Sequence, residues 1–408
     1  MDIGPSERIN PDILKWARET AGLSLAEAAE KLGLKDTAKA TAVERLHKLE
    51  SGDGDAGQSL LRKAVAAYRR PLIAFYLPAP PRRGERGEDF RSQARSVSAR
   101  DNATLDALVR DVRARQQMLR EALEESEDGA DLLPFVGSAR ITDETRKVAA
   151  AIRTTLGITE DQQRRCKGAT QLFALLRAAA EKAGVYVLLL GDVGSYHSDL
   201  GEDVFRGFAL ADGLAPFVVI NDNDAEAARP FTLVHELAHI WIGASGVSGP
   251  LRDVPENVVE RFCNDTASQF LLPPDAIPDF SSLQTADFDS VSAAVTSLAG
   301  VWNVSEPAVA YRFVQKGWIA RTVASSLFAM FAERWRREKE REKRNRKPDD
   351  RGPSSYIVRR HRLGAGLLDT VRRALQEETL TYTRAAKILG VGPASVPRLL
   401  REERRPMR

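Results

Sequence analysis

The side chains best suited to chemistry lie in one short stretch, His235-Glu236-Leu237-Ala238-His239. Residues four apart lie on the same face of a helix, so the two imidazoles can point at one metal ion. Glu236 is turned about a quarter of a helical turn from His235, where it can take a proton from water beside that ion. This is the arrangement of zinc peptidases. A chance match is the alternative, but two of only five histidines form this pair.

A catalytic zinc site needs a third protein ligand. Glu256, Glu260 and Asn264 are spaced by four and share one face of a predicted helix that ends before Pro273. Spacing alone does not separate the two glutamates. Asp253 is a candidate cap, which would place Glu256 in the first turn, where the helix dipole is reason enough for a carboxylate. Glu260 would then lie mid-helix among apolar residues, where burial requires a cation partner, so we favour Glu260.

Two further side chains could reach this site. Cys263 lies three residues after Glu260 and is either a soft metal ligand or a small core residue. His197 lies in a predicted loop and is a candidate for contact with a substrate or transition state; the alternative is an ordinary loop histidine.

The sequence predicts that these residues are positioned by an α+β fold that is mostly helical. Residues 185–190 read as a buried strand, and residues 205–210 and 217–220 as a hairpin. We expect this hairpin to offer the edge with which an extended peptide pairs. Pro230 suits the first turn of the histidine helix, and Gly243 suits its end. Other helices are expected over residues 104–125, 142–156, 170–183, 301–317 and 322–346.

Residues 10–79 are predicted to form a small helical domain, with helices over 12–20 and 24–32 and a capping box of Ser24 and Glu27. Residues 23–33, 49–52 and 67–78 resemble an XRE-type helix-turn-helix domain. DNA binding would need base-reading side chains, for which Arg45 and Lys48 are the candidates. Because charges over residues 39–54 nearly balance, a module for protein contact or sensing is the alternative.

The stretch from Phe205 to Pro273 resembles the catalytic core of the ImmA/IrrE family of metallopeptidases. The matching blocks are residues 205–210, 215–221 and 229–239, followed by the block that begins at Glu260. The resemblance implies Glu260 as the third ligand, Glu236 as general base and one zinc ion per chain, with another divalent ion as the alternative. It also places a small core residue at Cys263. An XRE-like domain is often fused to this core.

The composition is that of a globular protein with a nearly balanced net charge of +3. No apolar run reaches the roughly 18 residues that span a bilayer, no secretory signal is recognisable and only two cysteines occur, so we expect a cytoplasmic protein without a membrane partner. Residues 333–347 are basic and predict either a phosphate-binding helix or, as we favour, a solvated one.

We expect five segments: the helix-turn-helix domain (1–79), a linker and helical scaffold (80–160), the peptidase domain (161–320), a basic helix and linker (321–355), and a helix-turn-helix-like C-terminal domain (356–408).

The sequence favours an intracellular zinc endopeptidase. By resemblance, its protein substrate would be a transcriptional regulator, of repressor or antitoxin type. A DNA-binding regulator that uses the peptidase fold as a sensor is the alternative, supported by the N-terminal domain and the basic C-terminal residues, but a sensor needs no base at Glu236. A third hypothesis is a scaffold that retains zinc for stability.

Overall fold

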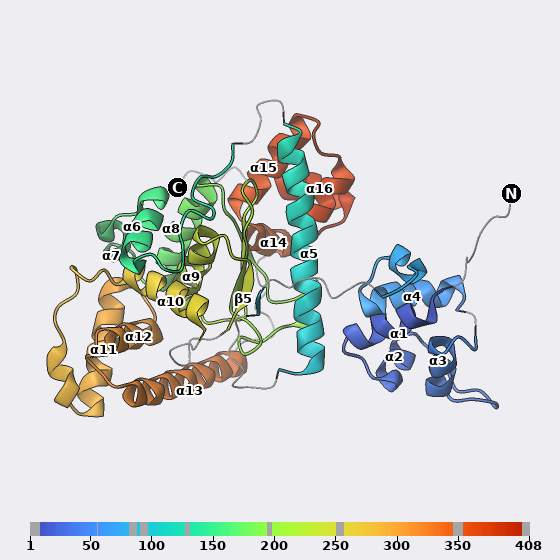
Figure 1. Ribbon diagram of the computed structural model, residues 1–408, viewed down its shortest axis with the longest axis horizontal. Helices are drawn as coiled ribbons and strands as arrows, with labels where there is room; N and C mark the ends of the chain where they lie inside the picture. Colours follow the sequence, from blue (N-terminus) through green and yellow to red (C-terminus); the bar gives the residue numbers. More distant parts are fainter. Residues whose placement is uncertain are drawn as a thin grey trace. The chain divides into compact units, whose positions relative to one another are not determined.

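The computed structural model describes residues 9–54, 56–80, 88–89, 97–126, 131–193, 198–249, 257–345 and 354–401. The chain divides into two compact units. Unit 1 comprises Met1–Arg86 and Arg95–Arg110, and unit 2 comprises Gly87–Ala94 and Asp111–Arg408. The α+β class, mostly helical with one small sheet, is confirmed (Figure 1). The finer five-segment division stays a prediction.

Unit 1 is a helical bundle around one apolar core. Both short helices expected from the sequence are present, and Ser24 and Glu27 form the expected capping box. Arg18 and Glu50 make a buried, two-pronged ion pair, with Nε–Oε1 at 2.8 Å and Nη2–Oε2 at 2.9 Å. The elements are α1 (Pro11–Thr20), α2 (Leu25–Lys31), α3 (Ala42–Glu50), α4 (Gln58–Tyr68), η1 (Leu72–Tyr76) and the start of α5 (Ala99–Glu124).

The connection between α2 and α3 is longer than in a simple helix-turn-helix. It spans residues 32–41 and contains a bridge between Thr37 and Ala40, whereas the turn of that motif has about 3–4 residues. Asp36 accepts a hydrogen bond from the first backbone N–H of α3, and Arg45 donates to the carbonyl of Lys35 at 2.8 Å. The connection is therefore fixed by side chains, and the helix-turn-helix assignment stays a prediction.

Unit 2 contains a five-stranded sheet in the order β1-β5-β3-β4-β2. The hairpin predicted from the sequence forms, with β3 and β4 antiparallel. It does not supply a free edge, and that expectation is wrong, because β5 pairs with β3 and β2 pairs with β4. The strands are β1 (Glu88–Asp89), β2 (Tyr186–Leu189), β3 (Gly207–Leu210), β4 (Phe217–Ile220) and β5 (Gly246–Ser248).

Helices cover this sheet, which explains why β2 to β5 are buried along their whole length. Figure 1 shows α6, α8, α9 and α10 on one side of the sheet, while α14 packs against β2. The helices are the remainder of α5, α6 (Thr145–Leu156), α7 (Glu160–Arg164), α8 (Ala169–Lys182), η3 (Glu226–Ala228), α9 (Arg229–Trp241), α10 (Val258–Leu271), η4 (Ser281–Thr285), α11 (Phe288–Trp302), α12 (Glu306–Gln315), α13 (Arg321–Asn345), α14 (Ser355–Leu363), α15 (Ala365–Gln376), α16 (Tyr382–Ile388), η5 (Pro393–Ser395) and α17 (Val396–Leu400). No helix among the described ranges is long and apolar enough to cross a bilayer.

The single helix expected over residues 301–317 is wrong. α11 ends at Trp302, and Asn303 adopts a left-handed conformation with φ of 57°. A new helix, α12, begins at Glu306, and Pro307 lies in its first turn, where proline needs no hydrogen-bond donor. The short polar side chain of asparagine tolerates the left-handed conformation that ends α11.

The C-terminal helices are tied to the sheet by buried polar contacts. Arg177 of α8 donates to the carbonyl oxygens of Val187, at 2.6 Å, and of His361, at 2.7 Å. Arg362 pairs with Asp192 and Asp222. Other arginines of this region donate to backbone carbonyl groups: Arg359, Arg360 and Arg372. These arginines serve to hold the fold together, and nucleic-acid contact by the C-terminal segment stays a prediction.

Candidate metal centre

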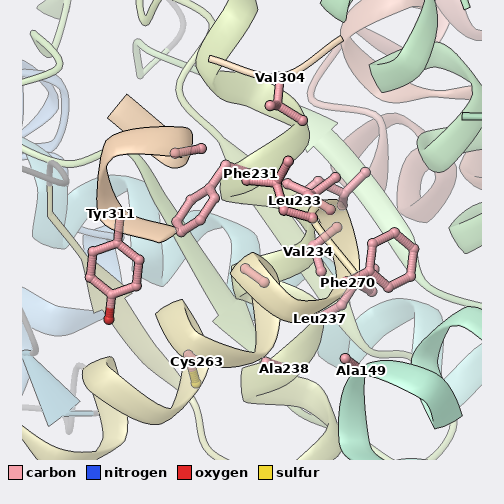
Figure 2. Close-up of a cluster of buried hydrophobic side chains, with 14 of the residues drawn as sticks. Ala149, Phe231, Leu233, Val234, Leu237, Ala238, Cys263, Phe270, Val304 and Tyr311 are labelled. Carbon is pink, nitrogen blue, oxygen red and sulfur yellow. The ribbon is translucent and has the colours of Figure 1, made fainter. Parts of the chain in front are cut away.

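The helix α9 presents the His-Glu-x-x-His residues from the centre of unit 2. Pro230 lies in its first turn as expected, and every residue from Pro230 to Trp241 is buried. Figure 2 shows its apolar side chains in the core, with Val234 and Leu237 near Phe270 of α10 and Phe231 beside Tyr311 of α12. Because α9 packs on all sides, the direction of its polar residues is fixed by the core.

Two histidines and one glutamate converge at this place. The Nε2 atoms of His235 and His239 lie 3.1 Å apart. Oε1 of Glu260 lies 3.1 Å from Nε2 of His239 and 3.5 Å from Nε2 of His235. All three side chains are buried, and they form a group that could hold a metal ion.

The spacing of these atoms fits a small divalent cation. Ligand atoms at about 2.0–2.1 Å from a tetrahedral ion lie roughly 3.3 Å from one another. The three separations of 3.1, 3.1 and 3.5 Å bracket this value. Two imidazoles and a carboxylate are ligands that suit zinc, and three protein ligands leave the fourth position for water.

The third member of the cluster is Glu260 of α10, the residue favoured from the sequence, but it lies at the start of the helix rather than in its middle. The cap of α10 is Asn257, whose side chain accepts from the backbone N–H groups of Val259 and Glu260. The expectation of a cap at Asp253, with Glu260 mid-helix, is therefore wrong, because Glu260 lies in the first turn. Asp253 and the alternative ligand Glu256 lie outside the described residues.

The charges of the cluster depend on one another. Burial lowers the pKa of His235, but the Glu260 carboxylate more than offsets this and raises the pKa to about 9. Burial raises the pKa of Glu260, whereas His235 and His239 lower it more strongly, to about 2. Burial also raises the pKa of Glu236, to about 8. The centre thus stabilises positive charge among the three ligands, which is what a cation site requires.

Glu236 lies directly against β3. It is fully buried, and neither carboxylate oxygen has a hydrogen-bond partner within normal distance among the described residues. A Cβ atom added to Gly207 would lie 2.6 Å from Oε1 of Glu236 and 2.9 Å from Cγ2 of Thr232. Gly207 therefore makes room for the carboxylate. A glycine inside a strand signals such a close approach, and this signal was present in the sequence.

Replacing Gly207 with alanine is expected to lower kcat about tenfold to a hundredfold, because the new methyl group displaces the Glu236 carboxylate. Zinc content should stay unchanged, since the three ligands lie elsewhere. The matched control is Gly300→Ala in α11, where an added Cβ meets no atom within 4 Å. Equal kcat for the two variants would show that the position of Glu236 does not depend on Gly207.

Ser248 is a member of the site that sequence reasoning missed. It is the last residue of β5 and lies opposite Gly207 in the sheet register. Its hydroxyl lies 3.1 Å from Nε2 of His235 and donates to Glu260 at 3.5 Å. No local pattern in the sequence signals this residue, because its place depends on the pairing of β5 with β3.

A second buried cluster lies beside the start of β3. Arg206 is 3.4 Å from the buried carboxylate of Asp224 and 3.9 Å from Glu202. Burial, and next the charge of Asp224, raise the pKa of Glu202 to about 7, while Arg206 and Lys339 oppose this.

Glu202→Gln is expected to raise the free energy of unfolding at pH 8 by about 1–2 kcal/mol, a value discounted for partial exposure, and to change it little at pH 4.5. Between pH 4.5 and about 7 the unfolded chain loses a proton that folded Glu202 keeps, so wild-type stability falls as pH rises through this window. Urea unfolding at both pH values measures the difference. Exposed Glu340→Gln is the control, and an equal effect of Glu202→Gln at both pH values would contradict the shifted pKa.

The other candidates from the sequence lie elsewhere. His197 lies outside the described residues, so its contact with a substrate stays a prediction. Cys263 is buried but does not belong to the metal-binding group, and burial raises the pKa of its thiol. Arg45 and Lys48 lie in unit 1, where Arg45 is engaged with Lys35 and Lys48 is exposed. Their contact with DNA stays a prediction.

Residues 180–314 match the family model Peptidase_M78, described as the IrrE N-terminal-like domain. No curated protein and no solved structure matches the chain. The matched range contains β2, the β3–β4 hairpin, α9, β5 and the whole of α10, and α9 and α10 carry all three residues of the cluster. Residues 180–314 are therefore an IrrE N-terminal-like domain of the Peptidase_M78 type, and His235, His239 and Glu260 form its buried metal-binding cluster.

Proposed function

We propose that the protein is a zinc-dependent endopeptidase that cleaves a regulator protein inside the cell. The observation that carries the proposal is the spacing of His235, His239 and Glu260, which fits a tetrahedral cation, together with a buried carboxylate at Glu236 that is not part of the ligand set. A structural or sensing zinc site needs only ligands. The additional carboxylate beside the ligands supports an enzyme.

A bound zinc ion would supply Lewis acidity, which acidifies water and polarises a peptide carbonyl. His235, His239 and Glu260 would hold it. Glu236 accepts a proton from the attacking water at a carboxylate oxygen and delivers it to the nitrogen of the leaving amine. Burial raises the pKa of Glu236, so the carboxyl group holds the proton taken from water until it is transferred to the amine nitrogen.

The class of substrate rests on the resemblance of residues 205–273 to the ImmA/IrrE family. We infer a transcriptional repressor or an antitoxin-like protein, and a cytoplasmic location. The N-terminal helical unit could direct the peptidase to DNA-bound regulators through Lys48, which is exposed on α3.

The test compares the protein N-termini of cells that express the wild type, Glu236→Gln or Arg45→Ala/Lys48→Ala. A protein that acquires a new N-terminus only when Glu236 is intact is the substrate. Loss of that cleavage in the double variant would support recruitment through DNA. If Glu236→Gln leaves the phenotype intact and only the double variant loses it, the peptidase proposal is wrong and the regulator alternative holds.

A further inference from the structure

The strand β5 ends beside the metal-binding cluster. Its last residue, Ser248, places a hydroxyl 3.1 Å from Nε2 of His235. The opposite residue in β3, Gly207, lies against the side chain of Glu236. A chain segment that runs along β5 therefore passes the ligands at the end of the strand.

One side of β5 pairs with β3, and the other side pairs with β1. β1 consists of Glu88 and Asp89, which pair in parallel with Gly246 and Val247. In the sequence these two residues lie between the helices of unit 1 and the long helix α5, in a stretch where proline and glycine are frequent. The protein's own connecting segment thus adds a strand beside the metal centre.

We propose that the outer edge of β5 accepts the extended backbone of the substrate, and that Glu88 and Asp89 occupy this edge until a substrate displaces them. The inference rests on the proposed peptidase function. Backbone N–H and C=O groups at a strand edge pair with an extended segment whatever its side chains are. The place beyond the Asp89–Val247 pair is that of Ser248, so a longer strand on the same edge would reach the cluster.

β1 is short, as expected of a strand that a substrate can displace from the edge of β5. Two residues make few backbone hydrogen bonds, so an extended protein segment that pairs over more of the edge can replace them. The alternative is that β1 only covers the edge and protects the protein from aggregation, as edge-covering segments do. The two explanations differ in what happens when β1 is removed.

The test uses the full-length, zinc-loaded protein carrying Glu236→Gln, so that binding is measured without cleavage. Proline at both positions, Glu88→Pro/Asp89→Pro, removes both N–H groups of β1. The control, Glu88→Ala/Asp89→Ala, removes the same side chains and keeps the N–H groups. The probe is fluorescein-labelled casein, an extended protein, and its anisotropy reports binding.

The Glu88→Pro/Asp89→Pro variant is expected to bind casein about tenfold more tightly than the Glu88→Ala/Asp89→Ala variant. This is the gain in apparent affinity if the edge of β5 is free about one-tenth of the time in the alanine variant and always free in the proline variant. Equal binding by the two variants, with more aggregation of the proline pair, would overturn the proposal in favour of edge protection. Absence of casein binding by every variant would overturn it as well.

Hydrogen exchange of the Glu236→Gln chain with Glu88 and Asp89 unchanged keeps the proposal testable if the Glu88→Pro/Asp89→Pro variant does not fold. Saturating casein should speed exchange at Glu88 and Asp89 and leave Val247 and Ser248 protected. Unchanged exchange at Glu88 and Asp89 would contradict displacement. Failure of the peptidase proposal is distinguishable, because it appears in cells as the absence of any new protein N-terminus that depends on Glu236, whatever the casein-binding results are.

Discussion

Replacing Glu236 with glutamine is expected to lower kcat for peptide-bond cleavage about a thousandfold while zinc stays bound. The carboxylate is fully buried beside Gly207, and it does not belong to the ligand group. Glutamine has nearly the same shape but accepts no proton at neutral pH. The loss should therefore fall on kcat, with little change in KM, because substrate contacts are retained.

The measurement is steady-state kinetics together with zinc content for the wild type, Glu236→Gln and Glu236→Asp. Aspartate keeps the acid but withdraws it by one methylene group, so its activity should lie between the other two. A Glu236→Gln protein that retains zinc and full activity would remove the general-base role. Loss of zinc together with activity would show instead that Glu236 supports the ligands.

Replacing Glu260 with alanine is expected to lower zinc affinity by at least about a hundredfold and to abolish cleavage. The carboxylate lies 3.1 Å from Nε2 of His239 and is the only anionic ligand of the group. Its removal leaves two neutral imidazoles, which form an incomplete site. Competition with a chromogenic chelator measures the affinity.

Glu256→Ala is the matched control for this variant, because Glu256 precedes Glu260 by four residues and is the alternative that spacing left open. It should retain wild-type affinity and activity. If Glu256→Ala loses zinc and Glu260→Ala retains it, the ligand assignment reverses. If both retain it, the cluster of His235, His239 and Glu260 is not a zinc site.

Local patterns in the sequence were sufficient for much of the fold. The i, i+4 spacing of His235 and His239 is set by the helix itself, so the pair could be identified without any tertiary contact. The capping box of Ser24 and Glu27 and the β3–β4 hairpin are similarly determined within a few residues. The predicted start of α10 is wrong, because Asn257 caps the helix and Val258 begins it.

The sequence by itself determined the two histidine ligands, the adjacent carboxylate and the mostly helical class. Only the tertiary structure decided that Glu260 completes the cluster, that Ser248 and Gly207 border it, and that β5 and β2 flank the hairpin. Helical periodicity is a property of neighbouring residues and can therefore be recognised in a short stretch of sequence. Strand order and the meeting of α9 with α10 depend on packing between distant segments, which no short window contains.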